Sequence, residues 1–382
     1  MLVEGKLLAR HALTLAEDGM VVEIAPWSGE EDEVTYLSGL ICPAFVNAHC
    51  HLELSHLAGM IPRHTGMAGF VMKLQGIRRN FEDEEKQAAI AKAAEAMYAR
   101  GIVAVGDICN GESTLAVKQA RSDMHFHNFV EVFGANPGKA EEIVLKGLDL
   151  VKKMGPHSSL TLHAPYSISV RLRDMVLDYA KVRGWVQSMH FLESTEERQL
   201  FEALDGPLMD MLRTFGLVFQ PHTYSSPSEF LLETLSTDVP TLFVHNTEIT
   251  TAEFQHIVDH FPKAYFVLCP KANQYIHNTL PSAPDFAAAP DRICIGTDSL
   301  AGNDRLDLYA EIQTLQAQFH TPTEILLRWA SENGAGALGL DPSHFSIAKG
   351  HQTRLLHIDG ILPESAILPE NVRITHLQPG RA

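Results

Sequence analysis

The sequence predicts an α/β protein built as a (β/α)₈ barrel, with a small β-domain formed from both chain termini. Three observations predict this class. From about residue 40 to residue 337, short β-rich apolar runs alternate with longer helical stretches, as in repeated βα units around a parallel sheet. These runs number eight, the count that such a barrel requires. The sequence also lacks the Gly-rich first turn that is typical of a doubly wound open sheet.

The predicted barrel strands follow one another through the central part of the chain. They cover Gly39 to His49, Ile102 to Asp107, Phe126 to Phe133, Leu160 to His163, Val186 to Phe191, Thr241 to His245, Ala264 to Leu268 and Arg292 to Gly296. Helices are predicted between them, among them Glu84 to Arg100 and Ala140 to Met154. Gly101 and Gly155 follow these two helices, where a left-handed residue commonly ends a helix.

The two ends of the chain differ from its centre. Short strand-like runs are predicted near the amino terminus and again near the carboxyl terminus. They are Leu7 to Ala9, Met20 to Ile24, Glu33 to Leu37, Thr353 to Ile358 and Val372 to Thr375. We therefore expect residues 1–40 and 345–382 to form one small β-domain, and residues 41–344 to form the barrel.

Composition restricts the class of partner and the compartment. The formal net charge of −17 disfavours binding to phosphate backbones, so we expect no nucleic-acid partner. No apolar run approaches the roughly 20 residues of a membrane helix, and the amino terminus does not resemble a signal peptide. The five cysteines are scattered and odd in number, which suits a reducing compartment. We expect a cytoplasmic protein that acts on a small molecule; its oligomeric state is open, with a homodimer as one alternative.

Candidate metal-binding residues lie at the ends of four predicted strands. Side chains alternate along a strand, so His49 and His51 point the same way. With 20 histidines in the chain, one His-x-His pair could arise by chance and be only surface or hydrogen-bonded residues. Three more apolar runs, however, end in residues able to bind a metal: His190, His245 and Asp298. Active sites of these barrels lie at the carboxyl ends of the strands, so we expect the five side chains to converge there.

Five motifs together resemble the amidohydrolase superfamily, and the resemblance spans nearly the whole chain. They are Pro43 to Glu53, with Ala44 where a glycine is usual, His163 to Ser167, His190 to Ser194, Cys269 to Asn273, and Gly296 to Ala301. They resemble the branch that contains adenosylhomocysteine deaminases, chlorohydrolases and aminodeoxyfutalosine deaminases, and are most similar to the last of these. The segment Lys349 to Thr353 departs from the Gly-Lys-x-Ala-Asp-Leu pattern that is common in the family.

The resemblance implies one divalent metal ion held by four residues. The implied ligands are His49, His51, His190 and Asp298, which leave a position for water, as in an open catalytic site. Zinc is the expected metal, and the same ligands accept Fe²⁺ or Mn²⁺. The fourth strand reads Leu160-Thr161-Leu162-His163 and lacks the lysine that carries a bridging carbamate in two-metal members, so one metal is expected.

The resemblance also implies the acid and base of a hydrolytic deamination. Glu193 is expected to shuttle protons to a ring nitrogen of the substrate, although a glutamate in such an acidic run could simply be exposed. His245 and Asp298 are expected to take a proton from the water that the metal activates, which leaves hydroxide as the nucleophile. The alternative for His245 is a histidine of the core. Four further residues are expected to contact substrate: His163, Ser299, Arg78 and Arg79.

The function expected from this resemblance is deamination of an adenine-type nucleoside with release of ammonia. The preferred substrate is 6-amino-6-deoxyfutalosine, an intermediate of menaquinone biosynthesis, because Arg78 and Arg79 could pair with its carboxylate. S-adenosylhomocysteine or 5′-methylthioadenosine is the alternative substrate, followed by those of chlorohydrolase-like or guanine-deaminase-like hydrolases. A non-catalytic barrel that serves as a scaffold is an alternative of another class.

Overall fold

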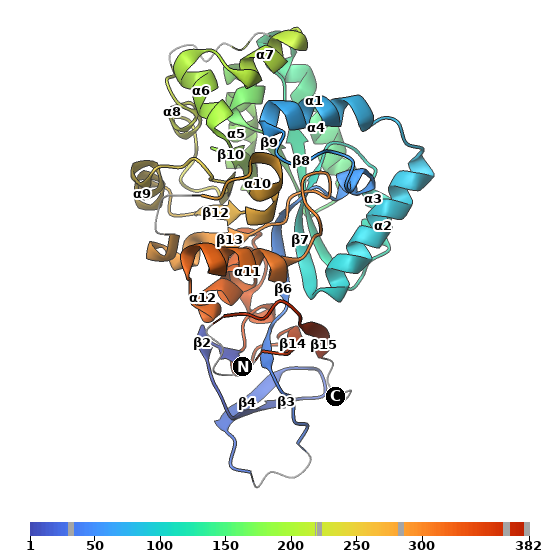
Figure 1. Ribbon diagram of the computed structural model, residues 1–382, viewed down its shortest axis with the longest axis vertical. Coiled ribbons are helices and arrows are strands. Elements are labelled where there is room, and N and C mark those ends of the chain that lie inside the picture. Colours follow the sequence, from blue (N-terminus) through green and yellow to red (C-terminus); the bar gives the residue numbers. More distant parts are fainter. Residues whose placement is uncertain (30–33, 218, 220–223, 282–285, 362–366, 378–382) are drawn as a thin grey trace.

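Parallel strands in the centre of the computed structural model form the barrel that the sequence predicts (Figure 1). The structure describes residues 1–29, 34–217, 219, 224–281, 286–361 and 367–377. Within these ranges eight strands build the barrel: β6 (Phe45–Cys50), β7 (Ile102–Cys109), β8 (His125–Val132), β9 (Ser158–Leu162), β10 (Gln187–Phe191), β11 (Thr241–His245), β12 (Ala264–Leu268) and β13 (Ile293–Ile295). The predicted fold class is confirmed.

The strands lie in chain order around the barrel. β6 to β9 form one parallel set and β10 to β13 another. The backbone N–H of His190 donates to the carbonyl of His163 at 2.9 Å and joins the two sets. On the other side, the N–H groups of Thr297 and Asp298 both donate to the carbonyl of His49, at 3.0 and 3.1 Å. The ring therefore closes at two points that carry predicted site residues.

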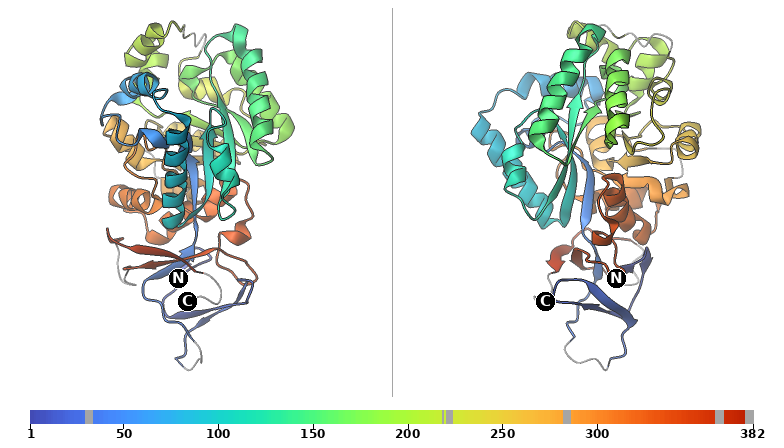
Figure 2. Two further views of the ribbon diagram at one scale, coloured as in Figure 1. Left: turned by 90° about the vertical axis from the view of Figure 1, so that its right-hand side faces the viewer. Right: turned by 180° about the vertical axis from the view of Figure 1, so that it is seen from behind.

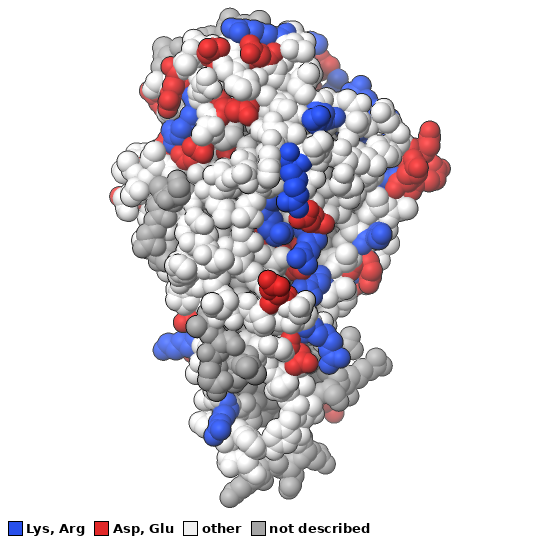
Figure 3. All heavy atoms as spheres, in the orientation of Figure 1, with Lys and Arg blue, Asp and Glu red and all other residues white. Residues whose placement is uncertain are grey.

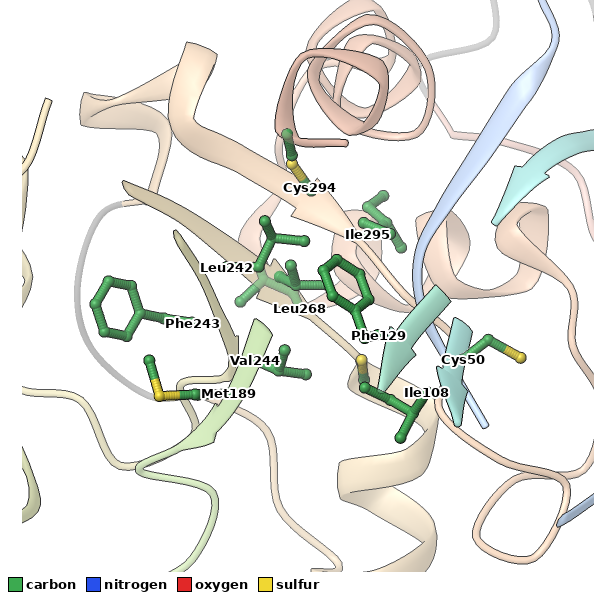
Figure 4. Packing of buried hydrophobic residues seen from close by; sticks show 14 of the residues in the cluster. Cys50, Ile108, Phe129, Met189, Leu242, Phe243, Val244, Leu268, Cys294 and Ile295 are labelled. Atoms are coloured by element: carbon green, nitrogen blue, oxygen red, sulfur yellow. The ribbon is translucent and has the colours of Figure 1, made fainter. Parts of the chain in front are cut away.

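The interior of the barrel below the site is apolar. Leu242 and Val244 of β11, Leu268 of β12 and Phe129 of β8 are fully buried and point toward one another (Figure 4). Because helices cover the outer face as well, the strands are buried on both sides and read as nearly continuous apolar runs. Burial of each large apolar side chain contributes about 1.5–3 kcal/mol, so this packed layer gives the site a rigid floor.

Helices surround the barrel, and the two predicted from their sequence pattern are confirmed. α2 begins with a capping box formed by Glu82 and Glu85, and α4 ends at Gly155, whose φ is +97°. The helices are α1 (Gly66–Ile77), α2 (Asp83–Ala99), α3 (Leu115–Gln119), α4 (Ala140–Met154), α5 (Val170–Arg183), α6 (Thr195–Ala203), α7 (Pro207–Thr214), α8 (Pro227–Leu232), α9 (Thr251–His260), α10 (Pro270–His277), α11 (Leu308–Phe319), α12 (Thr323–Trp329) and α13 (Glu332–Ala337). Short 3₁₀ helices are η1 (Leu52–Leu57), η2 (Pro137–Lys139), η3 (Pro165–Ser167), η4 (Phe286–Ala288), η5 (Pro290–Arg292) and η6 (Pro342–His344).

A small β-region below the barrel contains strands from both ends of the chain (Figure 2). β5 (Leu40–Pro43), β14 (Leu355–Asp359) and β15 (Arg373–Leu377) form an antiparallel sheet in the order β15-β14-β5. β1 (Leu2–Val3) pairs with β2 (Lys6–Leu7), and β3 (His11–Leu15) pairs with β4 (Val21–Pro26). The amino terminus lies in this region (Figure 1).

Two predictions for the amino-terminal part are wrong. The run Gly39 to His49 is two strands, because Ala44 leaves the barrel ladder and its N–H donates to the carbonyl of Arg354. Residues 40–43 therefore pair with β14 in the small sheet and not with the barrel. The predicted strand Glu33 to Leu37 also fails: residues 34–37 form no strand, and Tyr36 packs edge-on against Trp27 instead. Glu33 lies outside the described residues.

The surface carries charges of both signs. Lys and Arg side chains follow one another down the middle of the face in Figure 3, with Asp and Glu side chains among them. Searched over the described ranges, the chain has no helix with the length and apolar character needed to cross a bilayer.

Candidate active site

The side chains of His49, His51, His190 and Asp298 meet at the carboxyl ends of the barrel strands. The Nε2 atoms of His51 and His190 lie 3.1 Å apart. Asp298 Oδ1 lies 3.5 Å from Nε2 of His51 and 3.9 Å from Nε2 of His49. The ring centroids of His49 and His190 are 4.9 Å apart. The structure thus brings together all four residues that the sequence suggests as metal ligands.

These four side chains fit a divalent metal ion. Both ring nitrogens of His49 are buried and have no hydrogen-bond partner among the described residues, which costs about 1–3 kcal/mol per group unless another species binds them. Burial, followed by the neighbouring histidines, holds the pKa of His49 and His51 well below its usual value. The rings are therefore neutral, the form that binds metal. Three imidazole nitrogens and one carboxylate make a donor set suited to zinc, iron or manganese.

Glu193 and His245 form an acid and a base beside this cluster. His245, the last residue of β11, donates from Nδ1 to Asn273 Oδ1 at 2.8 Å. Its Nε2 therefore carries the lone pair, and it lies 3.5 Å from Glu193 Oε1. Burial raises the pKa of Glu193 to about 8, with a smaller contribution from Glu196. At neutral pH a protonated carboxyl thus lies next to an imidazole base.

Several residues at this rim have left-handed backbone conformations. The φ angles are +48° at Leu192, +76° at His245, +55° at Asn246 and +56° at Asp298. Such conformations are costly for residues other than glycine, and they cluster at functional sites when the surrounding structure holds them. They lie at or shortly after the carboxyl ends of β10, β11 and β13.

The predicted substrate contacts differ in where the structure places them. The His163 ring packs against that of His190 with centroids 4.8 Å apart, and its Nδ1 lies 2.8 Å from the hydroxyl of Ser167. Ser299 is buried, and its Oγ accepts the N–H of Gly302 at 3.3 Å. These two residues lie at the site.

Arg78 and Arg79 do not share one environment. Arg78 follows α1 and is half-buried. Burial raises the pKa of Glu53 and Glu131 and lowers that of His51, and the positive charge of Arg78 partly opposes the first two shifts and adds to the third. Arg79 is exposed. The structure therefore brings Arg78 toward the site and leaves Arg79 at the surface.

Three polar residues at the site were not identified from the sequence. The backbone N–H of Asn110 donates to Glu53 Oε2 at 2.9 Å, and its side chain donates to Glu131 Oε2 at 3.0 Å. Glu131 Oε1 lies 3.5 Å from His190 Nδ1. Glu131 lies between two valines at the end of an apolar strand. A charged residue is unusual there, and this was the sequence signal that could have identified Glu131 as a site residue. Glu53 lies inside the His49-to-Glu53 motif itself.

A buried ion pair supports the backbone next to His51. Lys118 Nζ lies 2.5 Å from Asp107 Oδ2 and donates to Asn128 Oδ1 at 2.7 Å. Asp107 Oδ1 accepts the N–H of Leu52 at 2.8 Å. The pair therefore fixes the residue that follows His51 at the end of β6.

Comparison with known proteins identifies the family. The sequence model described as "Amidohydrolase family" matches residues 40–377. The chain belongs to the amidohydrolase family. It is an enzyme that hydrolyses C–N bonds other than peptide bonds, and this assignment favours an enzyme over the alternative of a scaffold.

Curated relatives carry deaminase names. An aminodeoxyfutalosine deaminase from Nitratiruptor sp. is 26% identical over 347 residues, covering 86% of this chain and 80% of that protein. An adenosine deaminase from Helicobacter pylori is 26% identical over 317 residues, covering 80% of this chain and 75% of that protein.

Solved structures share the fold. H. pylori aminofutalosine deaminase has a TM-score of 0.76 at 22% identity, covering 94% of this chain and 89% of that chain. An adenosine deaminase from Xanthomonas campestris with bound zinc has a TM-score of 0.71 at 19% identity, covering 98% of this chain and 88% of that chain.

Proposed function

We propose that this protein is a mononuclear metal-dependent aminohydrolase that deaminates an adenine-type nucleoside, with 6-amino-6-deoxyfutalosine as the preferred substrate. The observation that carries the proposal is the Glu193 carboxyl placed 3.5 Å from the His245 base, beside the His49, His51, His190 and Asp298 cluster. The deaminase names of the relatives support the same reaction class. The five free cysteines agree with a cytoplasmic enzyme in a reducing compartment.

The metal would be held by His49, His51, His190 and Asp298, with zinc preferred and iron or manganese as alternatives. Such an ion lowers the pKa of water from 15.7 to about 7, so that hydroxide is available at physiological pH. Without a bound cation an ionised Asp298 would be unfavourable, because burial raises its pKa. The remaining steps rely on side chains of this chain.

His245 and Asp298 receive the first proton of the attacking water. Asn273 fixes the His245 tautomer, so Nε2 presents a lone pair toward the site. Nucleophilic addition forms a C–O bond at the amidine-like carbon of the base. The proton released from water is then delivered to the departing amino group, which leaves as ammonia.

Glu193 supplies and recovers the second proton. Its neutral carboxyl donates to the ring nitrogen next to the reacting carbon, so that negative charge does not build up there. As the C–N bond breaks and the carbonyl forms, the carboxylate takes the proton of the added hydroxyl group. Glu193 is protonated again at the end of the cycle. Of the two protons of water, one leaves in ammonia, and the other replaces the Glu193 proton that became the N–H of the product ring.

The preference among nucleosides rests on Arg78. A half-buried guanidinium near the strand ends can pair with a carboxylate on the distal part of the substrate, which adenosine and methylthioadenosine lack. S-adenosylhomocysteine also carries a carboxylate, and it ranks below 6-amino-6-deoxyfutalosine because two aminodeoxyfutalosine deaminases are 26% and 25% identical over most of this chain. Relatives named 5-methylthioadenosine/S-adenosylhomocysteine deaminase, such as one from Saccharophagus degradans at 22% identity over 382 residues, keep that substrate class as the second candidate.

Ammonia release from a panel of nucleosides tests the proposal. The panel contains 6-amino-6-deoxyfutalosine, adenosine, 5′-methylthioadenosine, S-adenosylhomocysteine and guanosine. We expect the highest kcat/KM for the carboxylate-bearing futalosine derivative. A preference for S-adenosylhomocysteine or methylthioadenosine would move the assignment to the second candidate, and activity on guanine compounds alone would exclude adenine-nucleoside deamination. Size-exclusion chromatography with light scattering would settle whether the enzyme is a homodimer.

A further inference from the structure

One turn of α10 reaches both members of the proposed acid–base pair. Asn273 and His277 are four residues apart in this helix, so their side chains lie on the same face. Asn273 Oδ1 lies 2.8 Å from His245 Nδ1, and His277 Nε2 lies 3.6 Å from Glu193 Oε1. The first contact fixes the base. The second contact has no role in the steps described above.

The Glu193 carboxyl lies between two imidazole rings. Its Oε1 atom is 3.5 Å from His245 Nε2 and 3.6 Å from His277 Nε2. The side chain of His277 is only 7% exposed, and within the described ranges its buried Nε2 has no hydrogen-bond partner. Burial lowers the pKa of His277 to about 4, so its ring is neutral and one nitrogen carries a hydrogen. Glu193 Oε1 is an acceptor within reach of a small movement of this ring.

We propose that His277 is a positioning residue for Glu193, donating from Nε2–H to Oε1 and thereby keeping the acidic proton of Glu193 on Oε2. The proposal rests on the proposed function, in which Glu193 is the proton donor. His245 Nε2 cannot hold Oε1 in this way, because its lone pair, and not an N–H, faces the carboxyl. His277 supplies the donor that the pair otherwise lacks.

The contact also acts during turnover. When the O–H bond at Oε2 breaks and the proton forms an N–H bond on the substrate ring, a negative charge is left on the carboxyl. The N–H of His277 stabilises this charge, because hydrogen bonds to ionised groups are stronger than those between neutral groups. The same donor therefore orients the acid before proton transfer and stabilises its conjugate base afterwards.

Removal of this donor changes the titration of Glu193 in a defined direction. Loss of a hydrogen bond to the charged form raises the pKa of a carboxyl group. The other groups that face Glu193 stay unchanged in a His277 variant: His245 of β11, Asp298 after β13, Tyr166 of η3, Glu196 and Glu197 of α6, and Cys269 at the start of α10.

The test follows the Glu193 carboxyl directly in the metal-loaded enzyme. ¹³C NMR of protein labelled at the glutamate carboxyl carbon gives the titration of Glu193, identified as the signal missing in Glu193→Gln. We expect Glu193 to titrate at a higher pH in His277→Phe than in the wild type, and at an intermediate pH in His277→Gln, which keeps an N–H donor. His260→Phe removes an exposed histidine of α9 and serves as the matched control. An unchanged or lower titration in His277→Phe overturns the proposal.

Kinetics on the best nucleoside substrate give a second readout. His277→Phe should lower kcat about tenfold to a hundredfold, the effect of losing one hydrogen bond to a charged group. KM and metal content should stay near the wild-type values, and His277→Gln should recover part of kcat. Equal kcat in His277→Phe and wild type would contradict the role proposed for His277 and leave the proposed function intact. A wild-type enzyme inactive on every nucleoside defeats the proposed function, while the titration still decides the role of His277.

Discussion

The backbone carbonyl of His49 accepts the backbone N–H of Asp298 at 3.1 Å. This bond joins the first and last barrel strands at the level where both residues place their side chains in the candidate metal site. Closure of the barrel and assembly of the site are therefore one event: the aspartate meets the two histidines of β6 only when the ring is complete. The site should accordingly require an intact barrel, whereas the barrel should not require an intact site.

Substitution of a proposed ligand tests this asymmetry. His190→Ala and Asp298→Ala should lose the bound metal and activity while the barrel still folds, because an open catalytic site contributes less to folding than a closed structural one. Elemental analysis gives the metal content and circular dichroism the fold. Full metal occupancy in both variants would mean that other residues hold the ion.

The role of Glu193 is tested by an isosteric change. Glu193→Gln keeps the size of the side chain but has no acidic proton to give. Turnover should fall by about two to four orders of magnitude, the usual effect of a positioned general acid, with unchanged metal content. The matched control is Glu202→Gln, a change at an exposed glutamate of α6. Near-normal turnover in Glu193→Gln would assign the acid to another residue.

The pH dependence of kcat follows from the same group. Burial raises the pKa of Glu193 to about 8, so the carboxyl is protonated at neutral pH and loses its proton as the pH rises through that value. Because the donor form is the protonated one, kcat should stay level up to neutral pH and decline above about pH 8. In Glu193→Gln this alkaline decline should disappear. If kcat of Glu193→Gln declines at the same pH as in the wild type, a different group causes the decline.

Arg78 and Arg79 provide a matched pair for substrate charge. Arg78→Ala should lower kcat/KM for a carboxylate-bearing adenine nucleoside about tenfold to a hundredfold, and barely change it for adenosine. Arg79→Ala, a change at the exposed neighbour, should affect neither substrate. Equal losses of Arg78→Ala on both substrates would remove the basis for preferring 6-amino-6-deoxyfutalosine.

The buried Lys118–Asp107 pair should matter for stability. Lys118→Met leaves the Asp107 carboxylate buried without its partner and should reduce the free energy of unfolding by about 3–5 kcal/mol. The double variant Lys118→Met/Asp107→Asn removes both charges and should lose less. Urea unfolding measures both; a double variant less stable than Lys118→Met would show that the pair is not the source of the effect.

Strand-level features were predictable because they are local. The eight apolar runs and the two helices ended by Gly101 and Gly155 follow from periodicity and capping, which act within a few residues. The division of residues 39–49 into β5 and β6 was not predictable in the same way. Both halves are apolar and extended, and only pairing of β5 with β14, more than 300 residues further along the chain, separates them.

The site shows the same division. His49, His51, His190, His245 and Asp298 end strands and could be identified one by one, because a polar residue there stands out from an apolar run. Asn110 directly follows β7, whereas Asn273 and His277 lie in α10 after β12, and polar residues are ordinary in both places. Their roles depend on which strand end lies across the barrel mouth, and this is a property of the closed ring.

The most direct test of the account is deaminase turnover measured against metal bound. Enzyme stripped of metal is reconstituted with increasing zinc, and ammonia release from 6-amino-6-deoxyfutalosine and adenosine is measured together with zinc per chain. The account predicts that turnover rises in proportion to bound metal and reaches its plateau at one ion per chain. Full turnover in the stripped enzyme, or a plateau only at two ions per chain, would contradict a mononuclear metal-dependent aminohydrolase.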